Sequence, residues 1–123
     1  MRTLAISMSA ALVLASSVCA NDGPIGPQNE VPKLLLAITA DDYTGFVADG
    51  NSAFQGLKKD QFKAVVSQLS SKLKAGYDLT YLGDLNQHGY QVTLWRIRFK
   101  SGGDDLIATL SMKDGKVGGF WIK

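Results

Sequence analysis

The side chains that most often take part in chemistry are few in this sequence, and the first of them is a single histidine. His88 precedes Gly89 between two stretches that alternate apolar and polar residues, a pattern typical of a tight hairpin turn. A metal site or a Ser-His-Asp arrangement needs further ligands or partners, which no spacing around His88 supplies. We therefore predict a surface turn residue at this position, and neither a metal ion nor another cofactor in the protein.

Two adjacent carboxylates, Asp104 and Asp105, follow the glycine pair Gly102-Gly103. Neighbouring residues of a strand point to opposite faces, so the two carboxylates cannot act on one substrate as general acid and base. Neither this glycine pair nor Gly118-Gly119 stands between a strand and a helix, as a phosphate-binding loop requires. The sequence predicts a turn at the first pair, a bend in a strand at the second, and no catalytic residue at either.

Two arginines, Arg96 and Arg98, stand two residues apart in an apolar stretch and therefore share one face of a predicted strand. A guanidinium in such surroundings needs a carboxylate, a group of carbonyls or a bound anion. Two interpretations stay open, namely internal salt bridges, or contact with the carboxylate of a ligand or a partner protein. The acids considered for internal salt bridges are Asp41, Asp42 and Asp49. The candidate ligand-binding residues are Arg96, Arg98, Tyr81 and Trp121.

The chain begins as a secretory precursor does. Arg2 is followed by an uncharged, largely apolar run from Leu4 to Val18 and then by the small residue Ala20, which is the order found in signal peptides. The run is shorter than the roughly 20 residues of a membrane-spanning helix. We predict a signal peptide over residues 1–20, cleavage after Ala20, and a periplasmic or secreted product without stable membrane insertion. A lipid anchor on Cys19 is the alternative.

Composition indicates what kind of domain remains after cleavage. Cys19 is the only cysteine in 123 residues, so the mature chain has no disulfide. The net charge of +2 falls by one with the loss of Arg2, and the basic residues are scattered among acidic ones, which argues against a nucleic-acid partner. All three prolines lie in residues 21–32, which we predict to be a flexible linker that the fold does not need. Residues 33–123 are long enough for one domain with a hydrophobic core.

The first half of this domain is predicted to be helical. Residues 33–57 have apolar side chains at nearly helical spacing, interrupted by glycines, which favours short helices. Apolar residues then recur at helical spacing from Phe62 to Leu73. We predict an amphipathic helix here, with Asp60 as its N-cap and Gly76 as its C-terminal stop.

After this helix the apolar residues alternate with a period of two, which predicts strands separated by short turns. The expected strands are Tyr77 to Gln87, Tyr90 to Lys100, Asp104 to Lys113 and Lys116 to Lys123. They form a four-stranded antiparallel meander with the helices packed on it, which is an α+β fold.

Pairing the strands across these turns places apolar residues on both faces of the sheet, although the helices can cover only one face. In the predicted register, Arg96 shares a face with Tyr81 and Trp121. The candidate interface residues lie on the other face and are Trp95, Ile97, Ile107, Phe120 and Ile122. We predict that a protein partner or a second copy of the chain, forming a homodimer, covers this other face.

A helical half followed by a curved antiparallel meander resembles the cystatin-like and nuclear transport factor 2-like (SnoaL-like) architecture, over about residues 33–123. The segments Gly89–Phe99 and Lys113–Ile122 are similar to those of small exported bacterial proteins of uncharacterised function. Enzymes of this architecture place an Asp and a His or Tyr inside a cone, and this chain has no such pair at matching positions. The resemblance therefore implies a fold and no particular activity.

Together these observations favour an exported, non-enzymatic binding domain that acts through a protein partner or self-association. An inhibitor or immunity-type protein is one form of that function. The alternative is a small-molecule-binding or degenerate enzyme domain of the SnoaL-like type, with its ligand in the cone interior beside Arg96, Tyr81 and Trp121.

Overall fold

The structure is a computed structural model that describes residues 23–123. The predicted signal peptide and the predicted cleavage site lie outside these residues. The described part contains the helices α2 (Ile25–Thr39), α3 (Tyr43–Val47), α4 (Ser52–Gln55) and α5 (Lys59–Lys74). They are followed by the strands β1 (Tyr77–Gln87), β2 (Tyr90–Phe99), β3 (Leu106–Lys113) and β4 (Lys116–Ile122).

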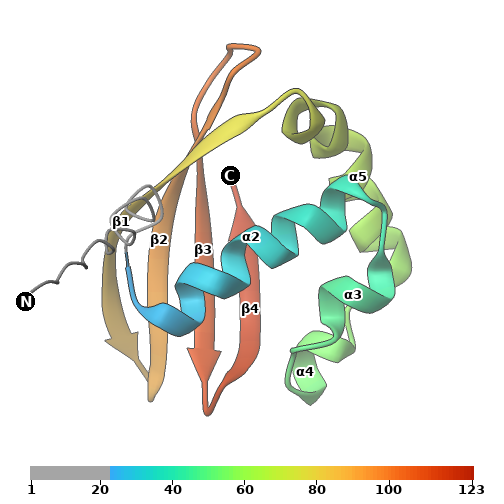
Figure 1. Ribbon diagram of the computed structural model, residues 1–123. Coiled ribbons are helices and arrows are strands. Elements are labelled where there is room, and N and C mark those ends of the chain that lie inside the picture. Colours follow the sequence, from blue (N-terminus) through green and yellow to red (C-terminus); the bar gives the residue numbers. More distant parts are fainter. Residues whose placement is uncertain (1–22) are drawn as a thin grey trace, which may run out of the picture.

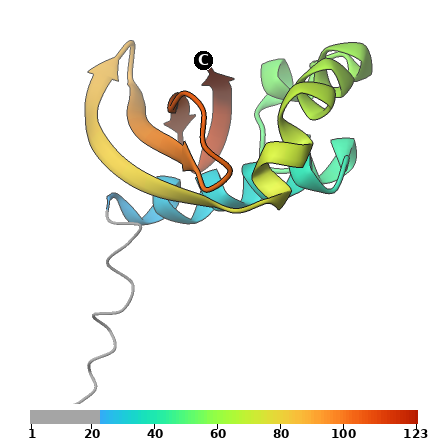
Figure 2. The same ribbon diagram turned by 90° about the horizontal axis from the view of Figure 1, so that it is seen from above.

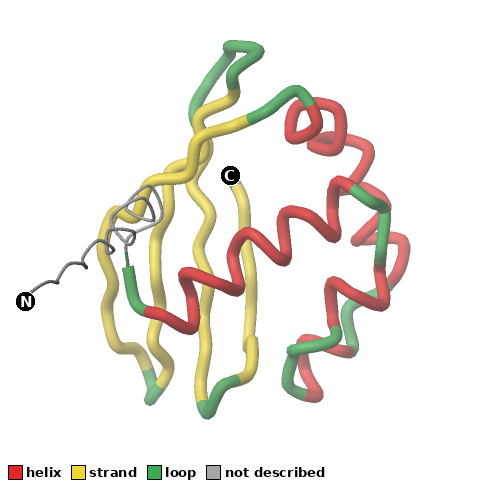
Figure 3. Tube along the Cα trace, viewed as in Figure 1, coloured by secondary structure: helices red, strands yellow, loops and turns green. Residues whose placement is uncertain are grey.

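The four strands form one antiparallel sheet in the order β1-β2-β3-β4, so the predicted α+β fold with a four-stranded meander is confirmed. Helix α2 crosses one face of the sheet, and α3, α4 and α5 lie beyond β4 (Figures 1 and 3). Viewed from above, the first hairpin curves strongly and α2 runs along one side of the sheet (Figure 2). No helix of residues 23–123 crosses the other side.

Tight turns set the two outer hairpins. His88 and Gly89 have φ values of 54° and 82°, and Asp114 and Gly115 have φ values of 54° and 77°. Two consecutive residues with positive φ are the requirement of a type I′ turn, whose twist matches that of the flanking strands. The prediction of a turn at His88 is confirmed, and its side chain is exposed.

Helix α2 begins inside the segment predicted to be a linker, so that prediction is wrong for residues 25–32. Pro24 precedes the helix and Pro27 lies in its first turn, where a missing backbone N–H breaks no helical hydrogen bond. Pro27, Glu30 and Val31 are buried in this part of the helix. Two of the three prolines that suggested a flexible linker therefore mark the start of a packed helix, and the third, Pro32, lies inside it.

The amphipathic helix α5 is present as predicted, with small differences at its start. It begins at Lys59 with Lys58 at the N-cap position, and Asp60 lies in the first turn without acting as the cap. A carboxylate there still interacts favourably with the positive end of the helix dipole. After the helix, Gly76 adopts a φ of 107°, which suits a glycine stop.

The hydrophobic core lies between the helices and the face of the sheet that α2 crosses. Its fully buried side chains come from α2, α5 and the three strands β2, β3 and β4. Rings of Phe46, Phe54 and Phe62 pack together, with Phe46 and Phe62 centroids 4.9 Å apart. On the sheet side, Trp95 is 0 % exposed and donates a hydrogen bond from its indole Nε1 to the Thr93 hydroxyl at 3.0 Å.

The register differs from the predicted one by a single residue, and this difference exchanges the faces of several side chains. Trp95 pairs with Ala108 and Arg96 with Ile107, because the β2–β3 loop spans residues 100–105. An extra residue interrupts β1 between Tyr81 and Gly83, and another interrupts β4 near Gly118. Each bulge reverses the side-chain alternation beyond it.

Candidate functional site

The face of the sheet opposite α2, which we call the open face, carries a group of apolar and polar side chains around Arg96. Arg96 lies between Thr80 of β1 and Ile107 of β3. One step further along the strands, Leu94 pairs with Thr109, and Thr109 pairs with Trp121. Four strands therefore contribute adjacent residues to one surface.

Large apolar side chains on the open face are accessible to solvent. Trp121 is 55 % exposed, Leu85 43 % and Ile107 42 %. On the covered face, by contrast, Trp95, Ile97, Ala108 and Leu110 are all 0 % exposed. The open face is thus an apolar surface that no described residue covers, and such surfaces are typical of interaction sites.

A glycine positions the Trp121 ring on this surface. A Cβ atom at Gly119 would lie 2.2 Å from Cη2 of Trp121, so the indole ring rests on the backbone of Gly119. A Cβ atom at Gly118 would lie 2.5 Å from Cε2 of Tyr90. The sequence predicts a bend at this glycine pair, and the structure adds a close approach of aromatic rings to the strand backbone there.

Arg96 has no carboxylate partner among residues 23–123. Its Nε atom is buried and makes no hydrogen bond, and its Nη2 atom is 3.5 Å from the Thr80 hydroxyl oxygen, at the limit of a hydrogen bond. Beside it, Arg98 is exposed and binds Asp105 through two contacts of 3.4 Å. The free energy of such an exposed ion pair is small.

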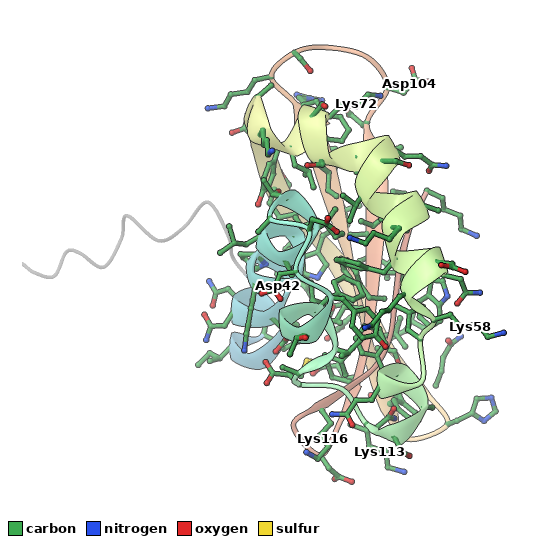
Figure 4. The ribbon with its side chains drawn as sticks, turned by 90° about the vertical axis from the view of Figure 1, so that its right-hand side faces the viewer. Asp42, Lys58, Lys72, Asp104, Lys113 and Lys116 are labelled. Atoms are coloured by element: carbon green, nitrogen blue, oxygen red, sulfur yellow. The ribbon has the colours of Figure 1, made fainter. Side chains whose placement is uncertain are left out.

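The three acids considered as internal partners of the two arginines are engaged elsewhere, so salt bridges with them are absent, and the internal salt bridge that forms joins Arg98 to Asp105. Asp41 binds Lys63 at 2.7 Å, and Asp49 binds Lys33 at 2.5 Å. Asp42 caps α3 by accepting a hydrogen bond from the Gly45 N–H at 3.0 Å. Asp42 lies in the helical layer with α2 and α3, well separated from Asp104 on the β2–β3 loop (Figure 4).

The structure separates the four predicted ligand-binding residues. Arg96, Arg98 and Trp121 share the open face, whereas Tyr81 lies on the covered face with its ring centroid 5.1 Å from that of Trp95. The prediction that Tyr81 lies beside Arg96 is therefore wrong. The bulge after Tyr81 is the cause, because it shifts the pairing of β1 by one residue.

The predicted interface residues do not form a shared accessible face. Trp95 and Ile97 are fully buried beneath the helices, and Phe120 and Ile122 lie half-buried on the same covered side. Only Ile107 lies on the open face. The accessible surface is thus the one that carries Arg96 and Trp121, because the helices pack on the face that carries Trp95 and Ile97.

A groove of about 350 Å³ separates α5 from the edge of the sheet. The residues that line it are Ile38, Phe46, Val65, Gln68, Leu69, Leu106, Phe120, Ile122 and Lys123. It occupies the place of the predicted cone interior, but Arg96, Tyr81 and Trp121 are absent from its lining. The predicted lining of an interior ligand site is therefore wrong.

A cluster of charged groups beside α2 escaped the sequence prediction. Burial, together with the negative charge of Asp49, raises the pKa of Glu30 to about 7. A hydrogen bond from Lys33 holds the pKa of Asp49 below its usual value. Glu30 precedes Leu34 and Ile38 at helical spacing, so a prediction of helix in this segment would have placed it on the buried side.

The described part of the chain contains neither a group of metal-binding side chains nor a membrane-spanning helix. Among residues 23–123, no three His, Cys, Asp or Glu side chains lie close enough together to hold a metal ion. Within the same range, no helix has the length and apolar character needed to cross a membrane.

Comparison with known proteins found no matching family model and no matching curated protein. Among solved structures, the chain is similar to an NTF2-like protein of unknown function from Cytophaga hutchinsonii, with a TM-score of 0.40 and 8 % identity over 78 % of this chain and 87 % of that one. It is also similar to an uncharacterised cystatin-fold protein from Novosphingobium aromaticivorans, with a TM-score of 0.39 and 12 % identity over 77 % of this chain and 95 % of that one. Both names denote the fold that the sequence resembles, and neither states an activity.

Proposed function

We propose that this protein is an exported, non-enzymatic binding domain whose open face binds a protein partner. The observation that carries the proposal is the solvent-exposed apolar group of Ile107, Trp121 and Leu85 on the face that also holds an arginine without a carboxylate partner. Apolar side chains at the centre of a polar surface, with Trp and Arg among them, are the composition of energetically important interface residues. An inhibitor or immunity-type role is one form of this function, because it also requires a face that docks on another protein.

Export is the second part of the proposal, and the residues at the start of the chain support it. A positive residue, an apolar run and small residues before Asn21 are what a signal peptidase recognises. Cleavage after Ala20 would leave every residue of the described domain in the mature chain. The partner is therefore expected in the periplasm or outside the cell.

Site-specific photo-crosslinking tests the position of the binding face. We would place the photoreactive residue p-benzoylphenylalanine at Ile107 in one variant and at Leu36 in the control. Leu36 is 66 % exposed on α2, away from the open face. In an envelope extract, we expect the variant at Ile107 to form a discrete adduct that the variant at Leu36 does not form.

The adduct needs a second test, since capture alone does not establish function. The captured protein, once identified and purified, should bind the wild-type chain in a fixed ratio and bind Thr109→Arg at least about ten-fold more weakly, equivalent to about 1.4 kcal/mol. Thr109 lies between Leu94 and Trp121, so this substitution crowds the open face. Equal adducts from both positions, or unchanged binding by Thr109→Arg, would contradict the proposal.

The apolar groove supports a second candidate function, the binding of a small apolar molecule. Its volume of about 350 Å³ lies within the range of small-molecule sites. Val65→Trp would fill the groove, because Val65 lines it from α5. A hydrophobic fluorescent dye that binds the wild-type chain and fails to bind Val65→Trp would favour this candidate, whereas equal binding to both proteins would count against it.

A further inference from the structure

Buried polar side-chain atoms of the described domain make hydrogen bonds, and the guanidinium of Arg96 is the exception. Among residues 23–123, its Nε atom is the single buried side-chain nitrogen or oxygen that lacks a hydrogen bond. Folding removes water from Nε without supplying an acceptor, and Nη2 has only the Thr80 hydroxyl at 3.5 Å. An unsatisfied buried donor destabilises the free protein, so its presence calls for a reason outside the folding of the domain.

We propose that Arg96 is the anchor of the open face and that the partner protein places a carboxylate on it. This inference rests on the proposed function and names the chemistry that the face recognises. The partner contributes an Asp or Glu side chain with apolar side chains beside it, because Ile107 and Leu94 lie beside Arg96 on the open face. Charge complementarity is the basis of the assignment.

The neighbours of Arg96 explain why the carboxylate has to come from outside. Thr80 and Ile107 occupy the positions across the strands, and neither carries a charge. Arg98, two residues along β2, forms the ion pair with Asp105, so this carboxylate does not pair with Arg96. A partner carboxylate would accept two parallel hydrogen bonds from the planar guanidinium, which is the strongest hydrogen-bonded pairing of these groups.

The surroundings favour a carboxylate on a protein over the phosphates of a nucleic acid. Ile107, across the strands from Arg96, and Leu94, two residues along β2, supply apolar surface that excludes water from the ion pair once a partner covers it. Phosphate backbones require several basic residues along one surface, and here Asp105 neutralises Arg98, the other arginine on this face. A guanidinium beside apolar side chains matches an acidic side chain beside apolar ones.

Thermal unfolding of the free protein gives the first test. Arg96→Met keeps the aliphatic part of the side chain and removes the unsatisfied donor. We expect its Tm to rise by about 4 °C or more relative to wild type. The matched control is Arg98→Met, which removes an exposed, paired guanidinium and should leave Tm within about 1 °C. A lower Tm for Arg96→Met would overturn the inference, because Arg96 would then stabilise the fold.

Nuclear magnetic resonance gives the second test, with phenylacetate as the probe and the neutral phenylacetamide as its control. Phenylacetate joins a carboxylate to an apolar ring, as the proposed partner surface does. We expect it to shift the Arg96 Nε–H and Ile107 methyl resonances at millimolar concentration, because Ile107 pairs with Arg96, and we expect phenylacetamide to shift neither. In Arg96→Met, the Ile107 methyl resonances should no longer respond. Equal shifts at Arg96 and Arg98 would overturn the assignment.

The outcomes separate this inference from the proposed function. A partner that crosslinks at Ile107 but binds Arg96→Met as tightly as wild type would sustain the function and overturn the anchor. Phenylacetate binding at Arg96 without any crosslinked partner would sustain the anchor and overturn the function. Light scattering that finds a wild-type dimer, converted to monomer by Arg96→Met, would overturn the assignment of the carboxylate to a different protein.

Discussion

Trp95 and Arg96 are neighbours in the sequence and point to opposite sides of β2, so Trp95 lies in the core and Arg96 lies on the open face. Trp95 is completely buried, and its one polar atom donates a hydrogen bond to Thr93. Arg96 lies on the open face with a buried Nε atom that has no acceptor. A polar group in a core is normally satisfied, as that of Trp95 is, so the exception at Arg96 marks the side of the sheet where function is expected.

Two tryptophans offer a direct comparison of the two faces. Trp95→Glu would bury an unpaired charge and leave a large cavity beneath the helices, and we expect it to destabilise the domain by at least about 4 kcal/mol and so to unfold it. Trp121→Glu changes a side chain that is 55 % exposed, and we expect a folded protein. Circular dichroism measures both; a folded Trp95→Glu variant would show that the covered face is misassigned.

The stability of the domain should depend on pH through Glu30. Its pKa is about 7 in the folded state against 4.5 for the free side chain, so the folded protein keeps a proton that the unfolded chain releases between these values. This contribution is fully present below pH 4.5 and is lost as the pH rises through 7. The shift corresponds to at most about 3 kcal/mol. We expect Tm to be higher at pH 5 than at pH 8.

Glu30→Gln provides the control, since the amide stays neutral across this range. Its Tm should vary less between pH 5 and pH 8 than that of the wild-type chain. The lowered pKa of Asp49 has the opposite effect on stability, but it acts only at more acidic pH. A wild-type profile that is flat, or that rises toward pH 8, would refute the role assigned to Glu30.

At the scale of elements, the strand boundaries could be predicted and the register could not. Alternation of apolar residues and the Gly89 and Gly115 turns located β1, β2 and β4 to within a residue. The register depends on bulges at Leu82 and Gly118 and on the length of the β2–β3 loop. A bulge adds one residue without altering the composition of a strand, so periodicity alone does not reveal it.

The same limit applies to the candidate site. The sequence identified Arg96 and Trp121 as residues of interest, because an arginine in an apolar strand and an aromatic residue after two glycines are visible without a structure. The face that a strand residue occupies depends on single-residue shifts in strand pairing. The shift after Tyr81 is the reason why Tyr81 lies on the covered face, away from Arg96. The missing partner of Arg96 is a tertiary property, since it depends on where Asp41, Asp42 and Asp49 are bound.

Helix α2 gives a prediction that reverses the expectation from its prolines. Val31 is 0 % exposed and lies in the segment that composition alone assigned to a linker. We expect Val31→Ala to destabilise the domain by about 1 to 3 kcal/mol through the loss of buried methyl groups. Leu36→Ala, on the exposed side of the same helix, should change the stability by less than about 0.5 kcal/mol. Denaturant unfolding distinguishes them, and equal stabilities would restore the linker interpretation.

For the whole molecule, the arrangement of layers leaves one face of a curved sheet without cover in residues 23–123. Helix α2 crosses the sheet on one side, and α3, α4 and α5 gather beyond β4 (Figures 1 and 2). An antiparallel sheet with one solvated face normally presents polar residues there, as the threonines of the open face do. Ile107 and Trp121 depart from that pattern, and the proposed partner accounts for both.

The place where the protein works should follow from how its first residues are processed. Small residues before Asn21 match the specificity of signal peptidase, and helix α2 starts at Ile25, so cleavage after Ala20 would leave the helix and its capping residue Pro24 intact. N-terminal sequencing of the exported protein should therefore begin at Asn21. Mass spectrometry checks the alternative, because an acylated Cys19 would add the mass of its lipid and hold the domain at a membrane. In that case the open face would recognise its partner from a membrane surface, and the assignment to a soluble compartment would be wrong.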